Sequence, residues 1–127
     1  MIIFIVITYK INFSQEIISY FKSQNICNGY NFNFIPIGLD EGDDEEILNK
    51  IYKKLNDIKN LETVVVFSDV GLPTKLAKRI EIKDNNIELF RAKGSLIENG
   101  YLSYIMLNTK APKETIEQVI NDKIEKY

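Results

Sequence analysis

Continuous apolar runs alternate with amphipathic stretches along the chain. Ile2 to Ile7 is a run of β-branched and aromatic residues, which is typical of a strand covered by helices on both faces. Thr63 to Phe67 is a second such run, and Phe32 to Ile37 and Ile87 to Ala92 predict two further strands. Pro36 places its strand at or near an edge of the sheet, because proline donates no hydrogen bond to a ladder.

Stretches with helical spacing of apolar residues separate these strands. A capping serine, a cluster of acidic residues or a proline marks the start of most of them. The predicted helices run from Ser14 to the Asn28–Gly29 turn and over Asp43–Ile58, Pro73–Ile80, Leu96–Met106 and Pro112–Ile124. Alternating strands and helices predict an α/β fold with right-handed crossovers: a three-layer sandwich with a mostly parallel central sheet.

Length and composition restrict the classes of function. A chain of 127 residues is predicted to form one domain over residues 1–127. Its 16 basic and 18 acidic residues give a net charge of −2 with no basic stripe, which argues against nucleic acid as a partner. The apolar run at the N-terminus is too short to cross a bilayer, so no membrane span is expected. The single cysteine, Cys27, can form neither an internal disulfide nor a zinc site, and this favours a cytoplasmic location.

The loops that follow the first three strands form the candidate site. In an open parallel sheet, ligands bind beyond the carboxyl ends of the strands, where the strand order reverses. The candidate residues in these loops are Thr8, Tyr9, Lys10, Gly38, Asp40, Ser68, Asp69 and Gly71. Asp69 is the strongest single candidate, because a carboxylate at a strand end can orient a partner group. The alternative is that Asp69 is a turn residue that caps the next helix.

Two common uses of this architecture do not fit the first loop. A flavodoxin-like phosphate site needs a loop rich in serine, threonine and glycine, and Tyr9 to Asn12 contains no glycine. A receiver domain needs an acidic pair after the first strand, which is absent. The acidic cluster Asp40 to Glu46 is better interpreted as a helix N-terminus than as a metal site. No metal and no cofactor is therefore expected.

The order of short motifs over nearly the whole chain resembles the mannose-type IIA domain of the bacterial phosphoenolpyruvate-dependent phosphotransferase system. The likeness is greatest to the phosphotransfer subunit of dihydroxyacetone kinase. Ile35 to Asp40 is similar to the second strand and Gly-x-Asp loop of that family, and Phe67 to Gly71 to its Asp-x-Gly motif. Gly94 to Gly100 resembles the small-residue and Glu-Gly segment that leads into its late helix.

The resemblance implies a phosphoryl-accepting histidine at the end of the first strand, oriented by the aspartate that matches Asp69. The chain contains no histidine, and Tyr9 stands at the matching position. A phenol is mostly protonated at neutral pH, and a phosphotyrosine ester has too little transfer potential for an onward relay. No catalytic residue of the family's phosphotransfer is therefore expected in this chain.

The resulting hypothesis is a docking or regulatory protein that binds a phosphotransferase carrier protein or a dihydroxyacetone kinase subunit. The resemblance also implies a mannose-IIA-like, flavodoxin-like topology for the α/β sandwich, and a homodimer. The alternative is a domain that binds a small ligand, or an unrelated enzyme, at the Asp69 cleft, with Lys10 and Lys93 bordering the cleft. A cleft filled by Tyr9 would favour docking, whereas an open cleft with Asp69 exposed would favour ligand binding or catalysis.

Overall fold

The computed structural model describes residues 1–23, 32–92 and 124–126. The elements in chain order are β1 (Ile2–Thr8), α1 (Ile11–Ser23), β2 (Phe32–Gly38), the 3-10 turn η1 (Leu39–Glu41), α2 (Asp44–Asn56), β3 (Thr63–Ser68), α3 (Leu72–Arg79), β4 (Glu88–Ala92) and β5 (Ile124–Lys126). The predicted alternation of strands and helices is confirmed over these residues.

The sheet has the strand order β2-β1-β3-β4-β5. The first four strands are parallel, and β5 pairs with β4 in the antiparallel direction. The prediction of a mostly parallel sheet is therefore confirmed, and β2, which contains Pro36, is an edge strand of the described sheet. The chain passes from β1 to β2 on one side and then crosses to β3 on the other, so the strand order reverses between β1 and β3.

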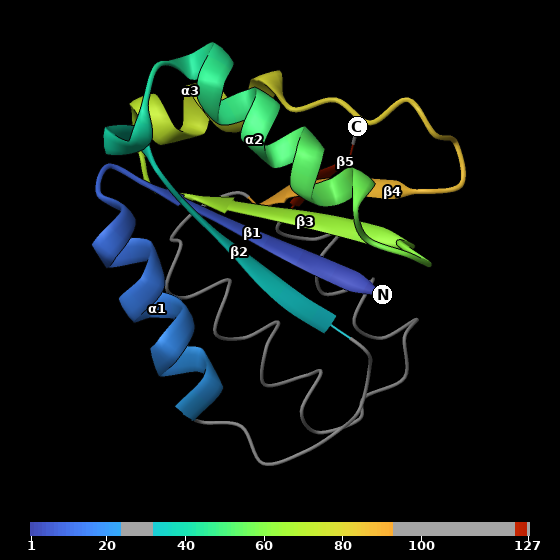
Figure 1. Ribbon diagram of the computed structural model, residues 1–127, viewed down its shortest axis with the longest axis horizontal. Helices are drawn as coiled ribbons and strands as arrows, with labels where there is room; N and C mark the ends of the chain where they lie inside the picture. Colours follow the sequence, from blue (N-terminus) through green and yellow to red (C-terminus); the bar gives the residue numbers. More distant parts are fainter. Residues whose placement is uncertain (24–31, 93–123, 127) are drawn as a thin grey trace.

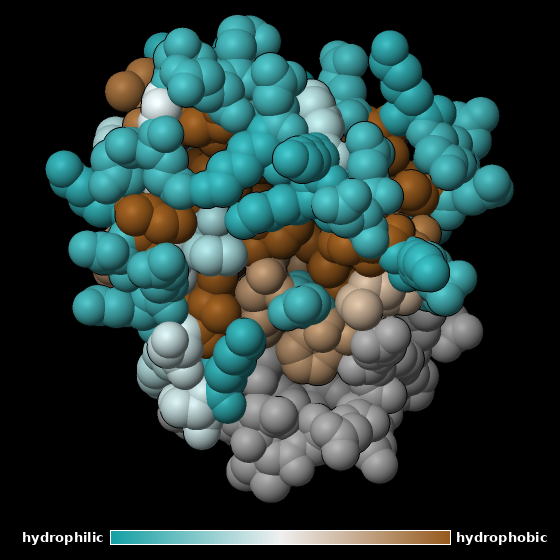
Figure 2. Space-filling view, in the orientation of Figure 1, coloured by the Kyte–Doolittle hydropathy of each residue, from teal (hydrophilic) through white to brown (hydrophobic). Residues whose placement is uncertain are grey.

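Helices cover both faces of this sheet, which gives three layers (Figure 1). Alternate residues of β1 point to opposite faces. Ile3, Ile5 and Ile7 belong to the cluster that α2 and α3 cover, whereas Phe4 and Val6 pack against α1. Seen from the side, apolar residues form a band below the hydrophilic surface of α2 (Figure 2).

The two halves of the core differ in chemistry. The side under α2 and α3 is almost wholly aliphatic. The α1 side contains an aromatic group centred on Phe4, whose ring stacks on Phe34 and Phe67 with centroids 5.4 and 5.7 Å apart. Such ring pairs contribute about 1 kcal/mol each beyond their burial. Both faces of β1 are therefore fully packed, and only its carboxyl end is available for a site.

Three sequence predictions need correction. Helix α1 begins at Ile11, so Ser14 lies inside its first turns and is no cap. Helix α2 ends at Asn56, so Ile58 lies beyond it and packs on the core from the following loop. Ile124 belongs to β5 and to no helix, because the backbone there pairs with β4. The predicted helix over Leu96–Met106 and the remainder of the one from Pro112 lie outside the described residues, as does Cys27.

Within the described residues, no helix is both long enough and apolar enough to cross a membrane.

Candidate functional site

The three candidate loops meet at the carboxyl edge of the sheet. Thr8 at the end of β1 is paired in register with Gly38 of β2, and Ile7 with Ser68 of β3. The loops that follow these strands are therefore neighbours, as the parallel arrangement predicts. The strand reversal divides the edge into two halves, one between β1 and β2 and the other between β1 and β3.

A buried hydroxyl pair closes the first half. Thr8 and Ser14 are both fully buried, and their hydroxyl oxygens lie 2.7 Å apart. The Ser14 oxygen is also 2.7 Å from the carbonyl of Ile37 in β2 and 3.1 Å from that of Val6 in β1. The Thr8 hydroxyl also lies 2.6 Å from the carbonyl of Lys10. These contacts join β1, β2 and α1, which explains why a serine points inward from the helix.

Gly38 and Asp40 complete this half by contacts with the start of α1. The Ile11 N–H donates to the Asp40 carboxylate at 2.9 Å, so Asp40 satisfies a free N–H of the helix. A side chain at Gly38 would bring a carbon closer than 3.0 Å to the Ile11 backbone. The Gly38 N–H donates to Glu41, which is ion-paired with Lys50. Gly38 and Asp40 thus act in packing and capping.

Tyr9 bridges the second half, between β1 and β3. Its hydroxyl donates to the carbonyl of Val70 at 2.9 Å and accepts the Leu72 N–H at 3.3 Å. The phenol therefore lies across the point where the strand order reverses, with its one proton and one of its lone pairs in hydrogen bonds to the β3–α3 loop.

Gly71 makes this close approach feasible. Its φ of +86° lies in a region that residues with a side chain rarely adopt, and a carbon at its Cβ position would come closer than 3.0 Å to the Tyr9 hydroxyl. Tyr9 and Gly71 therefore fit one another as a pair. The local structure of this chain therefore requires a glycine at this position of the Asp-x-Gly motif.

Asp69 is half-buried and has a local structural role. Its carboxylate accepts the N–H of Val70 at 2.9 Å, and its backbone carbonyl accepts the Thr74 hydroxyl at 2.8 Å. Thr74 also lies 3.3 Å from the Ser68 hydroxyl. Asp69 is a turn residue, as one of the two interpretations predicted, but the residue at the cap position of α3 is Gly71. The structure gives no hydrogen bond between the side chains of Asp69 and Tyr9.

The acidic cluster after β2 is a helix N-terminus. Asp43 accepts the Glu46 N–H at 2.9 Å, and Glu46 reaches back to the Asp43 N–H at 3.3 Å, which is a capping box. In the part of the chain that the structure describes, no group of acidic, cysteine or histidine side chains is arranged to hold a metal ion. Lys10 is exposed at the edge, whereas Lys93 lies outside the described residues.

The β1–β3 half presents apolar side chains to solvent, which the sequence patterns do not reveal. Tyr9 is 44% exposed, Val70 73% and Leu72 56%. We call these three residues the apolar patch, since the Tyr9 hydroxyl bonds the backbone of the other two. Phe13, in the first turn of α1, is also 43% exposed. The sequence signal that could have indicated the patch is the pair of large apolar residues on either side of Gly71, in a loop that is otherwise polar.

Arg79 at the end of α3 contacts the start of α2 and lies outside this edge site. Its guanidinium is paired with Glu45 and with Asp44, the latter at 3.4 Å. The hydrogen bond to Glu45 raises the pKa of Arg79 above its usual value. The pair is exposed and joins the two helices at the surface.

Comparisons with known proteins establish the fold and no family. No protein-family model matches the chain, and no curated protein matches it. A solved structure of a protein of unknown function, EF1359, is similar, with a TM-score of 0.68 and 14% sequence identity. The match covers 96% of this chain and 94% of that chain. The two proteins therefore share the α/β fold over almost their whole length.

Proposed function

We propose that this protein is a docking or regulatory relative of the mannose-type IIA phosphotransferase proteins and is no active phosphoryl relay. The observation that carries the proposal is the Tyr9 bridge. By the sequence resemblance Tyr9 matches the family's histidine, and its phenol spans the β1–β3 half of the edge by hydrogen bonds to the Val70 carbonyl and the Leu72 N–H.

The chemistry of the bridge supports the loss of phosphotransfer. Forming a phosphate ester on the Tyr9 oxygen would remove the proton that it donates to Val70. Gly71 also packs so tightly that a carbon added at its Cβ position would lie closer than 3.0 Å to the Tyr9 oxygen, so the backbone is fitted to a phenol in this place. In addition, the Asp69 carboxylate accepts the Val70 N–H and makes no hydrogen bond to Tyr9.

The apolar patch supports docking. Val70 and Leu72 lie mostly in solvent at the edge where ligands of this fold class bind. Apolar side chains gathered around one aromatic residue are typical of the centre of a protein interface. The proposed partners are the general phosphotransferase carrier protein and the dihydroxyacetone kinase subunits, and we propose that the protein works as a homodimer in the cytoplasm. The alternative, a small-ligand or enzymatic site at Asp69, is less favoured because the crevice is bridged by Tyr9.

Calorimetric titration of the protein with each proposed partner tests this function. Binding should be measurable for the wild type and about tenfold weaker for Val70→Asp, which places a charge in the patch. Asn60→Asp is the matched control, since it adds the same charge in the exposed α2–β3 loop at the opposite edge of the sheet. Equal affinities of Val70→Asp and the wild type, or no binding of any proposed partner, would contradict the proposal.

A further inference from the structure

A short strand-like segment lies between α3 and β4. Helix α3 has only 8 residues, and an irregular run from Ile80 leads on to β4. In this run Ile80 is fully buried and Ile82 packs on the core, whereas Glu81 and Lys83 are exposed. Alternation with a period of two is the pattern of a β-strand. The segment 80–83 therefore resembles a strand that lies outside the sheet.

The backbone of this segment is largely unpaired. The Glu81 N–H donates to the Tyr52 hydroxyl on α2 at 3.2 Å, and this hydroxyl in turn donates to the Arg79 carbonyl. Within the described ranges, the backbone groups of Ile82 and Lys83 make no hydrogen bond. Unpaired backbone groups along an extended segment form a template for another strand.

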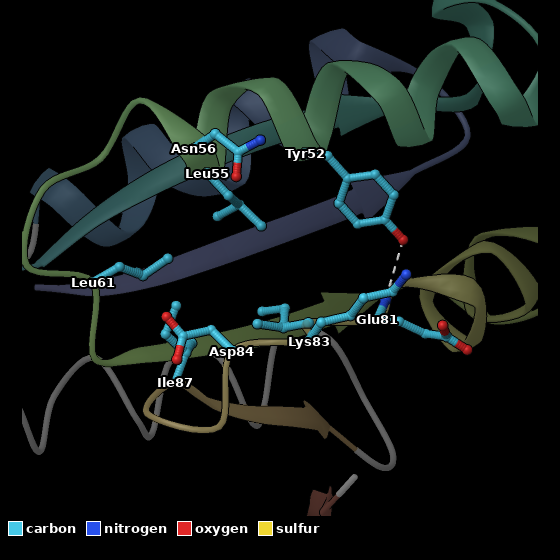
Figure 3. Close-up of a pocket in the computed structure, with 9 residues that line it drawn as sticks. Tyr52, Leu55, Asn56, Leu61, Glu81, Lys83, Asp84 and Ile87 are labelled. Carbon is cyan, nitrogen blue, oxygen red and sulfur yellow. Dashed lines mark hydrogen bonds between the residues drawn. The ribbon is translucent and has the colours of Figure 1, made fainter.

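Two open grooves border the segment. The first, of about 590 Å³, lies between the segment and α2. Tyr52, Leu55 and Asn56 of α2 line one wall, and Lys83 and Asp84 lie on the facing segment (Figure 3). The second groove, of about 530 Å³, is bounded by the same segment and by residues near the start of β4. Both volumes fall in the range of natural binding sites.

The contact with Tyr52 indicates which backbone groups face the first groove. In an extended segment, residues i and i+2 direct their N–H and C=O groups to the same side. The Glu81 N–H points to Tyr52, so an extended backbone directs the N–H and C=O of Lys83 to the α2 side as well. Leu55, Leu61 and Ile87 supply an apolar floor for side chains beside them. The groove thus combines backbone hydrogen-bonding groups with an apolar surface.

We propose that this groove binds an extended peptide segment of a partner protein, which pairs with Lys83 as an added strand. Its alternate apolar side chains would lie on Leu55 and Leu61, and its intervening side chains would point to solvent. The carboxylates of Glu81 and Asp84 outnumber the ammonium of Lys83 on the rim, so basic intervening residues are favoured. This surface lies apart from the apolar patch at the carboxyl edge and is independent of the proposed function.

A fluorescein-labelled hexapeptide of alternating valine and lysine is the probe. Its binding, followed by fluorescence anisotropy, should be about tenfold weaker in Lys83→Pro than in Lys83→Ala. Proline removes the N–H that faces the groove and suits an extended backbone, whereas alanine keeps this N–H and removes only the side chain. A peptide with glutamate in place of lysine should bind less tightly than the probe.

Hydrogen exchange gives a second measurement that needs no variant. The Lys83 amide should exchange rapidly in the free protein and slow down when the probe binds, while a probe N-methylated at its central valine should give no protection. The proposal is overturned if the probe fails to bind, if Lys83→Pro and Lys83→Ala bind it equally, or if bound probe leaves the Lys83 amide unprotected.

Discussion

The two halves of the carboxyl edge of the sheet differ in the contacts that fill them. Between β1 and β2, buried hydroxyls, a crowded glycine and a capping carboxylate fill the edge with short polar contacts. Between β1 and β3, one exposed aromatic side chain spans the gap, and apolar residues face solvent. The difference shows that the first half is filled by contacts that hold the fold together, whereas the second half leaves apolar side chains in solvent.

Substitution at Gly38 should have the largest effect on stability. Gly38→Ala places a carbon against the backbone of Ile11, which cannot rotate away as a side chain could. We expect a loss of about 3 kcal/mol in the free energy of unfolding, measured by urea denaturation. A loss below about 0.5 kcal/mol, the range of ordinary surface substitutions, would mean that the β1–β2 half yields easily, and the contrast between the halves would fail.

Ser14→Ala should have the next largest effect on stability. The substitution leaves the Thr8 hydroxyl and the Ile37 carbonyl without their buried partner, which costs about 2 kcal/mol. Ser19→Ala is the matched control, because Ser19 is exposed on the same helix. If the two variants unfold at the same urea concentration, the hydroxyl pair does not hold β1, β2 and α1 together.

The coupling free energy between Tyr9 and Gly71 should be smaller than these two effects. Gly71→Ala is expected to cost about 2 kcal/mol from its positive φ and from crowding by the Tyr9 hydroxyl. Tyr9→Phe removes this oxygen, so the same alanine substitution should cost about 1 kcal/mol less in the Tyr9→Phe background. Thermal denaturation of the four proteins in a double-mutant cycle measures this coupling. Additive effects would show that the two residues do not act as a pair.

The Arg79 pair should have the smallest effect. Its guanidinium is exposed, and pairing with Glu45 raises its pKa. A raised pKa in the folded state gives stability that is present at lower pH and lost only as the pH rises through that pKa, which lies above the usual arginine range. Arg79→Met should therefore lower the unfolding midpoint only slightly, and by the same amount at each pH from about 6 to 9. A pH-dependent difference in this interval would contradict the assignment.

The strands were predictable from the sequence because their apolar runs are continuous. The residues at which the helices begin were harder to predict. Ser14 has the side chain of a cap, but its hydroxyl bonds the carbonyls of β1 and β2, and Asp40, distant in the sequence, satisfies the Ile11 N–H instead. Such a contact depends on tertiary packing, which local patterns do not encode.

The candidate loops were also predictable, since parallel strands bring their carboxyl ends together. The different roles of the residues in these loops were not predictable. Asp69 has the residue type and position of an orienting carboxylate, yet it accepts the N–H of its own neighbour. The Tyr9 bridge joins residues more than 60 positions apart in the chain, and its geometry depends on the positive φ of Gly71.

The most direct test of the central claim is a phosphotransfer assay that supplies phosphoenolpyruvate and the two general phosphotransferase proteins to the wild type and to Tyr9→His. Binding of the carrier protein and of the dihydroxyacetone kinase subunits to the wild type is measured alongside. The account predicts that the wild type stays unphosphorylated while binding a partner, and that Tyr9→His acquires a phosphoryl group. Phosphorylation of the wild type, or a wild type that binds no partner beside an inert Tyr9→His, would contradict it.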